Sequence, residues 1–204
     1  MFKFYHKYIV PRLINKSMSS AEFNTTREGV VAPARGVVLE IGFGSGYNLP
    51  FYKGVEGLYA LDPSQELYDY ASERIKSVSF PVTYLKASAE HIPLAENSVD
   101  TVVSTWSLCS VDDVPKVLQE IRRVLKPQGK FIFVEHGQSP EKIKAWTQRL
   151  VTPLMKNFTG NCHLDRKVDD LIRESGLLIE SIQMFPEEGR PLMFSYRGIA
   201  TLPF

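Results

Sequence analysis

The feature that most constrains this 204-residue chain is a glycine-rich run directly after a short apolar stretch. Residues 36–41 are apolar almost throughout, as in a strand buried on both faces, and Gly42, Gly44 and Gly46 follow at every second position. Glycines allow a tight turn and let a ligand approach the backbone closely. In a parallel sheet this loop lies at the carboxyl edge, where ligands bind. We therefore expect an α/β fold with a ligand site after the first strand.

Two acidic residues accompany the glycine loop. Asp62 ends a second apolar run, twenty residues after Gly42, where an acid can accept hydrogen bonds from both hydroxyls of a ribose. An acidic helix cap is the alternative for Asp62, because it precedes Pro63 and a helical stretch. Glu40 lies inside the first strand and needs a partner there. We expect it to orient the loop or to receive the amino group of a cofactor, with a salt bridge to a neighbouring helix as the alternative.

The remainder of the chain alternates short β-rich runs with longer amphipathic stretches, which predicts a parallel sheet with helices on both faces. The predicted strands cover 36–41, 58–61, 82–85, 99–104 and 130–134, and the predicted helices cover 65–77, 113–125, 141–157 and 165–175. Lys126 to Gly129 is expected to end a helix and turn into the fifth strand. The last apolar runs, 177–185 and 191–202, are joined too closely for a parallel crossover, so they are expected to be antiparallel.

At this point the sequence resembles the class I S-adenosylmethionine-dependent methyltransferases. It is most similar to small bacterial members related to thiol S-methyltransferases and phosphatidylethanolamine methyltransferases. The resemblance is carried by VLEIGFGSGYNLPFY (38–52), LDPS (61–64), ASAEHIPLAENSVDTVVSTWSLCSV (87–111), RRVLKPQGKFIFVEHG (122–137) and GNCHLDR (160–166). It implies S-adenosylmethionine as cofactor and a Rossmann-like, seven-stranded, mostly parallel sheet with an antiparallel last strand and helices on both faces.

The resemblance also implies which residues bind the cofactor. It assigns the three loop glycines to the methionine portion, Asp62 to the ribose, and residues 88–90 to the adenine. Where the wider family usually has Asp, this chain has Ser88, so the adenine contact could fall to the Ser88 hydroxyl, the Ala89 backbone or Glu90. The full set expected to bind the cofactor is Glu40, Gly42, Gly44, Gly46, Asp62, Pro63, Ser88, Ala89, Glu90 and Ser104.

The chemistry of methyl transfer requires mainly that the acceptor be held in line. His136, just beyond the fifth strand, is the candidate general base, although it could simply cap a turn before Gly137. Trp106, Cys109 and His163 are expected to contact the acceptor. We expect a small apolar acceptor and favour a thiol, because a thiol is partly ionised near neutral pH and needs no dedicated base. The alternatives are a phospholipid or amine N-methyltransferase and a non-catalytic adenosyl-binding module.

Composition excludes several classes of function. The net charge of +1 predicts no nucleic-acid partner, and two cysteines are too few for a disulfide framework. No Tyr-x-x-x-Lys pair of a short-chain dehydrogenase occurs, and we expect no metal site, because the four histidines are scattered and Cys162 and His163 are adjacent rather than at ligand spacing. These features and the lack of a long apolar run predict a cytoplasmic protein.

The N-terminal segment is basic and aromatic. Residues 1–18 contain four cations and no acid among apolar side chains, which suits either a lid over the site or weak contact with a membrane surface. Pro11 is expected to split this segment. We predict a single domain in which 1–34 form a helical lid, 35–136 the cofactor-binding core, and 137–204 substrate-side helices and terminal strands.

Overall fold

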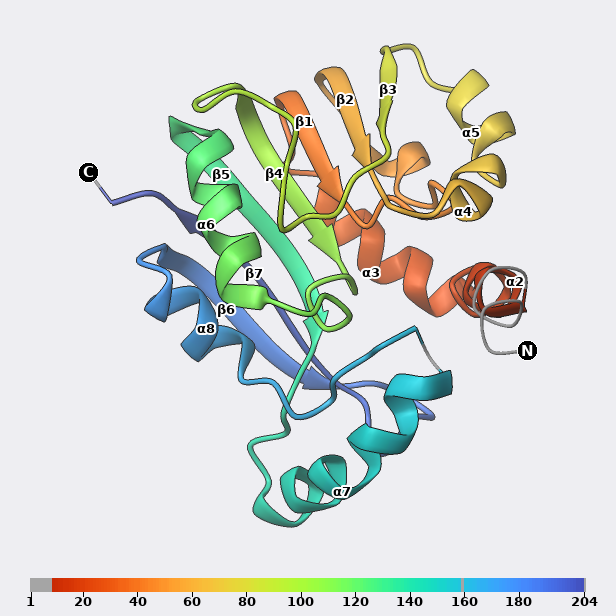
Figure 1. Cartoon of the computed structure of the whole chain (residues 1–204), viewed down its shortest axis with the longest axis vertical. Coiled ribbons are helices and arrows are strands. Elements are labelled where there is room, and N and C mark those ends of the chain that lie inside the picture. Colours follow the sequence, from red (N-terminus) through yellow and green to blue (C-terminus); the bar gives the residue numbers. More distant parts are fainter. Residues whose placement is uncertain (1–8, 159, 204) are drawn as a thin grey trace.

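A seven-stranded sheet forms the centre of the computed structural model, which describes residues 9–158 and 160–203 without the side chains of 157 and 158. The strand order is β3-β2-β1-β4-β5-β7-β6 (Figure 1). The strands are β1 (Gly36–Ile41), β2 (Val55–Leu61), β3 (Val82–Leu85), β4 (Val99–Thr105), β5 (Leu125–His136), β6 (Leu178–Pro186) and β7 (Phe194–Thr201). Strands β1 to β5 pair in parallel, and β7 is antiparallel to both β5 and β6. The predicted Rossmann-like fold is confirmed.

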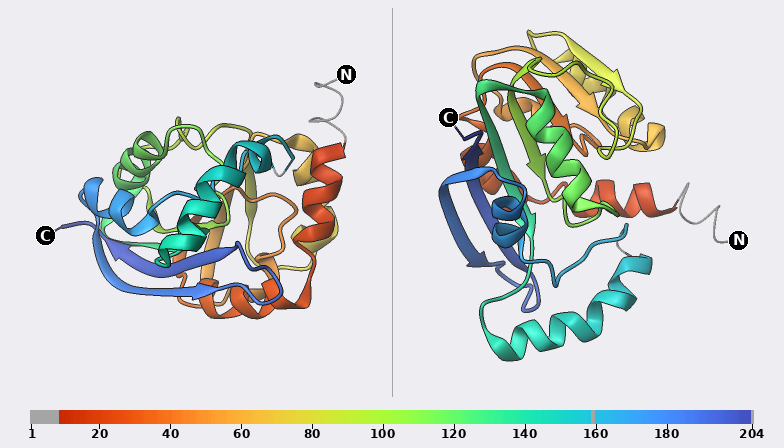
Figure 2. Two further views of the ribbon diagram at one scale, coloured as in Figure 1. Left: turned by 90° about the horizontal axis from the view of Figure 1, so that it is seen from below. Right: turned by 60° about the vertical axis from the view of Figure 1, so that its left-hand side comes forward.

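Helices cover both faces of the sheet. They are α2 (Val10–Ser17), α3 (Ala21–Val31), the 3-10 turn η2 (Leu49–Phe51), α4 (Gln65–Asp69), α5 (Ser72–Lys76), α6 (Val114–Val124), α7 (Lys142–Phe158) and α8 (Val168–Glu174). Helices α6 and α8 pack on one face, and α3, α4 and α5 on the other (Figures 1 and 2). Helices α2 and α7 lie beyond the carboxyl ends of the parallel strands (Figure 1). None of the helices described is long and apolar enough to cross a bilayer.

The alternation of side chains along each strand produces these two layers. In β1, Leu39 and Ile41 belong to the core under α6, whereas Val38 belongs to the core under α3. Helix α6 begins at its cap Asp113, whose carboxylate accepts a hydrogen bond from the Lys116 amide at 3.0 Å. All five of its aliphatic side chains in the core are buried, each contributing about 1.5–3 kcal/mol. The sheet is therefore a rigid platform for the loops at its ends.

The helix predicted over 65–77 is interrupted between α4 and α5. Ala71 at the break is completely buried, and a Cβ added to Gly46 would lie only 3.0 Å from its methyl group. Arg74 donates hydrogen bonds to the carbonyl oxygens of Tyr70 and Ser45, both at 3.0 Å. The break is thus stabilised by the packing of Ala71 against the glycine loop and by the hydrogen bond from Arg74 to the Tyr70 carbonyl oxygen.

Strand β5 is longer than predicted. Val99 pairs with Leu125 and Thr101 pairs with Lys130, so the register shifts between them. Lys126 to Gly129, which were expected to form a turn before the strand, instead lie within β5 at this register shift. The strand consequently begins five residues earlier than residue 130 and ends at His136. Its final residue therefore lies at the ligand edge of the sheet.

Candidate active site

The main cavity opens at the carboxyl ends of β1, β2 and β4, where the strand order reverses between β1 and β4. Its volume is about 1020 Å³, at the upper end of the range of small-molecule sites, roughly 300–1,000 Å³. The predicted site residues that line it are Glu40, Gly42, Gly44, Asp62, Pro63, Ser88, Ala89, Glu90, Trp106, Cys109 and His136. Gly46, Ser104 and His163 are described but lie outside this lining. The cavity is large enough for a cofactor and an acceptor together.

The three loop glycines have different physical roles. All three have positive φ, at +65° for Gly42, +54° for Gly44 and +71° for Gly46. A Cβ on Gly42 would lie 2.6 Å from the Cβ of Ser107, and a Cβ on Gly46 would lie 3.0 Å from the ring of Phe43. At Gly44 the nearest atom would be the Gly42 carbonyl oxygen at 3.8 Å. Gly42 and Gly46 thus allow the loop to pack, whereas Gly44 leaves its backbone open to a ligand.

Asp62 holds the glycine loop to the end of β2. Its Oδ2 accepts a hydrogen bond from the Gly44 amide and its Oδ1 accepts one from the Ser64 amide, both at 2.8 Å. Burial raises the pKa of Asp62, and these two amide hydrogen bonds oppose that rise. A carboxylate offers about four acceptor positions, so a ribose hydroxyl can still be accommodated. Asp62 therefore fits its expected binding role, whereas the alternative role as a helix cap is wrong, because Ser64 caps α4.

Glu40 orients the loop, as one of its expected roles required. Its Oε1 accepts a hydrogen bond from Asn48 Nδ2 at 2.9 Å, and its Oε2 accepts one from the Tyr52 hydroxyl at 2.7 Å. Burial raises its pKa to about 7, although these hydrogen bonds and the charge of Arg27 oppose the rise. The carboxylate therefore fixes the chain just after the glycine loop while it lines the cavity.

Arg27 is a site residue that sequence reasoning missed. It lies on α3, is only 2% exposed, and lines the cavity. Its guanidinium carbon lies 5.2 Å from the ring centroid of Tyr47 and 5.3 Å from that of Trp106. Burial lowers its pKa to about 10, so the side chain remains cationic at neutral pH. A signal was present, because this arginine occupies an apolar helix face with Phe23 and Val30.

The turn after β4 is held by a second buried acid that was not predicted. Glu135 accepts hydrogen bonds from the Ser104 hydroxyl at 2.6 Å and from the amides of Ser107 and Cys109 at 3.1 and 3.2 Å. Ser104 is therefore a support beneath the cavity. Trp106, within this turn, has a φ of +52°, an unfavourable conformation for a bulky residue that the turn enforces.

Several buried polar atoms of the cavity residues have no hydrogen-bond partner within the described part of the chain. They are Ser45 Oγ, Asn48 Oδ1, Trp106 Nε1 and His136 Nε2, the last of which lies at ion-pair distance, 3.1 Å, from Glu187 Oε1. Such atoms cost free energy unless a ligand or water satisfies them. A polar ligand in the cavity could form hydrogen bonds with these atoms, and the open space beside Gly44 allows it to approach the loop.

Residues 88–90 line the cavity from the loop that follows β3. The Ser88 hydroxyl donates a hydrogen bond to the Glu90 carboxylate. Glu90 also accepts hydrogen bonds from the amides of Asp112 and Asp113 at 3.2 and 3.4 Å. The loop is thus braced against the segment before α6, with Ala89 buried beside it.

His136, the last residue of β5, lies between two thiols and an acid. Its Nδ1 is 3.7 Å from Cys109 Sγ and 3.5 Å from Cys162 Sγ, and its Nε2 is 3.1 Å from Glu187 Oε1. Burial alone would lower its pKa, but Cys109 and Glu187 raise it to about 10. Both ring nitrogens thus face protein groups rather than open cavity, which weighs against its role as general base. His163 contributes its backbone instead, since its amide donates to the Cys109 carbonyl at 2.7 Å.

Helices α2 and α3 border the cavity on one side. Leu13, Ile14 and Met18 line it from the α2 segment. The Tyr47 hydroxyl of the glycine loop donates to the Asn15 carbonyl at 3.2 Å. Pro11 does not split α2 but lies in its first turn, where a missing amide hydrogen costs nothing. Residues 1–8 of the expected lid or membrane-contact segment lie outside the described residues.

Comparison with known proteins identifies relatives. A family model described as a methyltransferase domain matches residues 39–133. The thiol S-methyltransferase TMT1B of Rattus norvegicus is 36% identical over 138 residues, covering 64% of this chain and 55% of that protein. Its namesake from Homo sapiens is 30% identical over 175 residues, covering 81% of this chain and 72% of that protein. The matches thus span between about half and three quarters of these relatives.

A solved structure supports the fold separately. The crystal structure of the YcgJ protein from Bacillus subtilis superposes with a TM-score of 0.68 at 17% sequence identity. The superposition covers 90% of this chain and 98% of that chain. At this identity the likeness demonstrates a shared fold alone.

Proposed function

Because the chain belongs to the class I S-adenosylmethionine-dependent methyltransferases, we propose that it methylates a small apolar thiol. The enzyme class and the cofactor rest on the methyltransferase-domain match and the relatives. That the acceptor is a thiol is the part that we propose. The observation that supports it most is a soft, sulfur-rich end of the cavity, where Cys109, Cys162 and Met193 line the wall beside His136.

The residues of the cavity fit the cofactor. When bound, S-adenosylmethionine supplies an activated methyl group on a sulfonium that is a good leaving group. The open backbone at Gly44 and the partnerless Ser45 hydroxyl suit its amino-acid portion, and the Arg27 cation suits the carboxylate of that portion. Asp62 suits the ribose, and residues 88–90 the adenine. The protein's contribution is positioning, which can lower a barrier by roughly 7–11 kcal/mol.

The acceptor end suits an apolar molecule. Trp106 and Phe23 meet edge to face with ring centroids 4.5 Å apart, and both line the cavity. Leu13, Ile14 and Met18 add aliphatic surface from the N-terminal segment. We assign the α2 segment the role of a lid that excludes water from this end, whereas α3, also part of the predicted lid over 1–34, packs on the sheet instead.

A thiol also fits the proton chemistry of the site. His136 Nε2 lies 3.1 Å from Glu187 Oε1, and Nδ1 lies within 3.7 Å of two cysteine sulfurs, so both ring nitrogens already face protein groups. A thiol needs no strong base, because a few per cent is ionised near neutral pH and the thiolate is a strong nucleophile. An amine would have to lose a proton first.

Acceptors that differ only in the reacting atom test this proposal. Benzyl thiol, benzylamine and benzyl alcohol have the same apolar body, so their kcat/KM values compare the heteroatoms directly. We expect methylation of the thiol to exceed that of the amine and alcohol by at least about tenfold, equivalent to 1.4 kcal/mol. Vesicles of phosphatidylethanolamine form the fourth arm. Preferred methylation of benzylamine or of the lipid headgroup would refute the thiol assignment.

A further inference from the structure

We propose that Cys109, His136 and Cys162 bind a zinc ion whose fourth coordination position opens into the cavity. Among the residues that the structure describes, these three have ligand atoms that all lie within 4.8 Å of one another. They are 1%, 8% and 6% exposed, respectively, so the cluster is almost fully enclosed by protein. Two thiolates and one imidazole are a ligand set that favours zinc among the common divalent ions.

The observed distances match those that a tetrahedral zinc ion imposes. Zinc–sulfur bonds of about 2.3 Å and zinc–nitrogen bonds of about 2.0–2.1 Å place the nitrogen roughly 3.5 Å from each sulfur. His136 Nδ1 lies 3.5 Å from Cys162 Sγ and 3.7 Å from Cys109 Sγ. Both nitrogen–sulfur distances therefore agree with coordination of one ion by the three side chains.

The other ring nitrogen of His136 has the partner that zinc-bound histidines usually have. Glu187 Oε1 lies 3.1 Å from Nε2, and the carboxylate is itself held by the Ser195 hydroxyl at 2.6 Å and by Arg190 at 3.2 Å. A carboxylate behind a histidine fixes the ring orientation and the tautomer that presents Nδ1 to the metal. The contact between Glu187 and His136 does not involve the cysteines, and it also supports a bound zinc ion.

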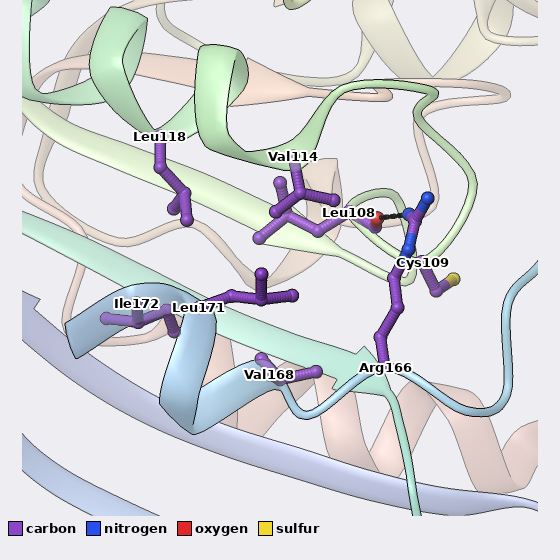
Figure 3. Close-up of a pocket in the computed structure, with 8 residues that line it drawn as sticks. All are labelled: Leu108, Cys109, Val114, Leu118, Arg166, Val168, Leu171 and Ile172. Atoms are coloured by element: carbon purple, nitrogen blue, oxygen red, sulfur yellow. Dashed lines mark hydrogen bonds between the residues drawn. The ribbon is translucent and has the colours of Figure 1, made fainter. Parts of the chain in front are cut away.

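The cluster joins three segments that are distant in the sequence. Cys109 follows β4, His136 ends β5, and Cys162 lies between α7 and α8. Arg166 secures the first segment by donating to the carbonyl oxygens of Leu108 and Val111, the latter at 2.7 Å. Figure 3 shows Arg166 meeting the Leu108 backbone, with the sulfur of Cys109 on the side away from the apolar residues of α6 and α8. The gap among those apolar residues has a volume of about 10 Å³ and holds at most one water. A larger ligand can therefore reach Cys109 only from the main cavity.

Three protein ligands leave one position for an exogenous ligand, as in catalytic zinc sites. All three ligands line the main cavity beside Trp106, so this position faces the acceptor end. A thiol that binds zinc loses its proton to solvent and is held as a thiolate. This use of the fourth position rests on the proposed function, whereas binding of the metal itself does not.

Metal analysis of the full chain tests the site directly. Protein stripped with a chelator and incubated with Zn²⁺ is expected to retain one ion per chain after gel filtration. Co²⁺ in its place should give the intense absorption of thiolate-to-cobalt charge transfer. Cys162→Ser and His136→Ala should each lose the ion, while His163→Ala, the neighbouring histidine outside the cluster, should keep it. Thermal unfolding of each variant verifies that it is folded.

A milder variant gives a graded result. Glu187→Gln preserves shape and should lower zinc affinity by roughly 10- to 100-fold with the ion still bound at saturation. No retained metal, a Cys109–Cys162 disulfide in its place, or loss of metal from His163→Ala would overturn the site. Benzyl thiol should shift the cobalt spectrum, and an unchanged spectrum would overturn the role of the fourth position. Failure of thiol methylation would refute the proposed function and leave the metal content unaffected.

Discussion

Alanine at each of two loop glycines separates ligand binding from loop packing. Gly42 and Gly44 both have positive φ, so alanine at either position incurs a similar backbone strain of about 1–2 kcal/mol. The surroundings differ, because a Cβ on Gly42 would meet the Ser107 side chain, whereas a Cβ on Gly44 would meet open cavity. The two variants therefore share the cost of backbone strain and differ in what the added methyl group contacts.

The structure sets the expected magnitudes. Gly44→Ala should cost about 1–2 kcal/mol of stability and lower the Tm by roughly 2–8 °C. Gly42→Ala should cost about 1–3 kcal/mol more, because its methyl group overpacks the turn after β4. Steric conflict with the bound cofactor should be worth a similar 1–3 kcal/mol in Gly44→Ala, or about a 5- to 150-fold loss of affinity.

Calorimetric titration with S-adenosylmethionine and thermal unfolding measure the two effects on the same samples. We expect Gly44→Ala to show the larger loss of affinity per degree of Tm lost. Wild-type affinity in Gly44→Ala would refute the assignment of this backbone to the cofactor. A greater loss of stability in Gly44→Ala than in Gly42→Ala would refute the packing argument.

Three further predictions concern charge and the N-terminal segment. Arg27→Met should lower the affinity for S-adenosylmethionine about 10- to 150-fold but leave the affinity for its decarboxylated analogue unchanged, and equal losses for both ligands would contradict a carboxylate contact. Burial raises the pKa of Glu40 from 4.5 to about 7, so between pH 4.5 and 7 the folded state binds a proton that the unfolded state has lost. Stability should therefore fall by up to about 3 kcal/mol as the pH rises from 4.5 to 7, and chemical denaturation should show this fall missing in Glu40→Gln. Deleting residues 1–18 should raise the KM for benzyl thiol, and salt-sensitive sedimentation with anionic vesicles, lost on the deletion, would instead support membrane contact.

The fold and the cofactor end of the site were accessible from sequence because their signals are local. An apolar strand, alternate glycines and Asp62 lie within one stretch of chain, so their spacing carries the prediction. Residues 88–90 were assigned to the adenine by the family resemblance and not by spacing. The interrupted helix at Ala71 and the long β5 were not accessible, because buried contacts and strand register decide them, and neither has a local pattern.

The acceptor end was less accessible because its residues meet only through the fold. Cys162 follows α7, yet its partners are Cys109 and His136 from other segments. Glu187 was missed for the same reason, since it reaches His136 from the end of β6. Ser104 has the spacing of a cavity residue, but β4 continues through Thr105, and its hydroxyl points to Glu135 instead.

A crystal structure with S-adenosylhomocysteine and benzyl thiol would show whether one cavity at the carboxyl ends of β1, β2 and β4 holds donor and acceptor together. We expect the ribose at Asp62, the amino-acid portion along Gly44, and the acceptor sulfur on the side of Trp106 and Cys109. A product bound away from the glycine loop, or a thiol bound elsewhere on the protein, would contradict this expectation.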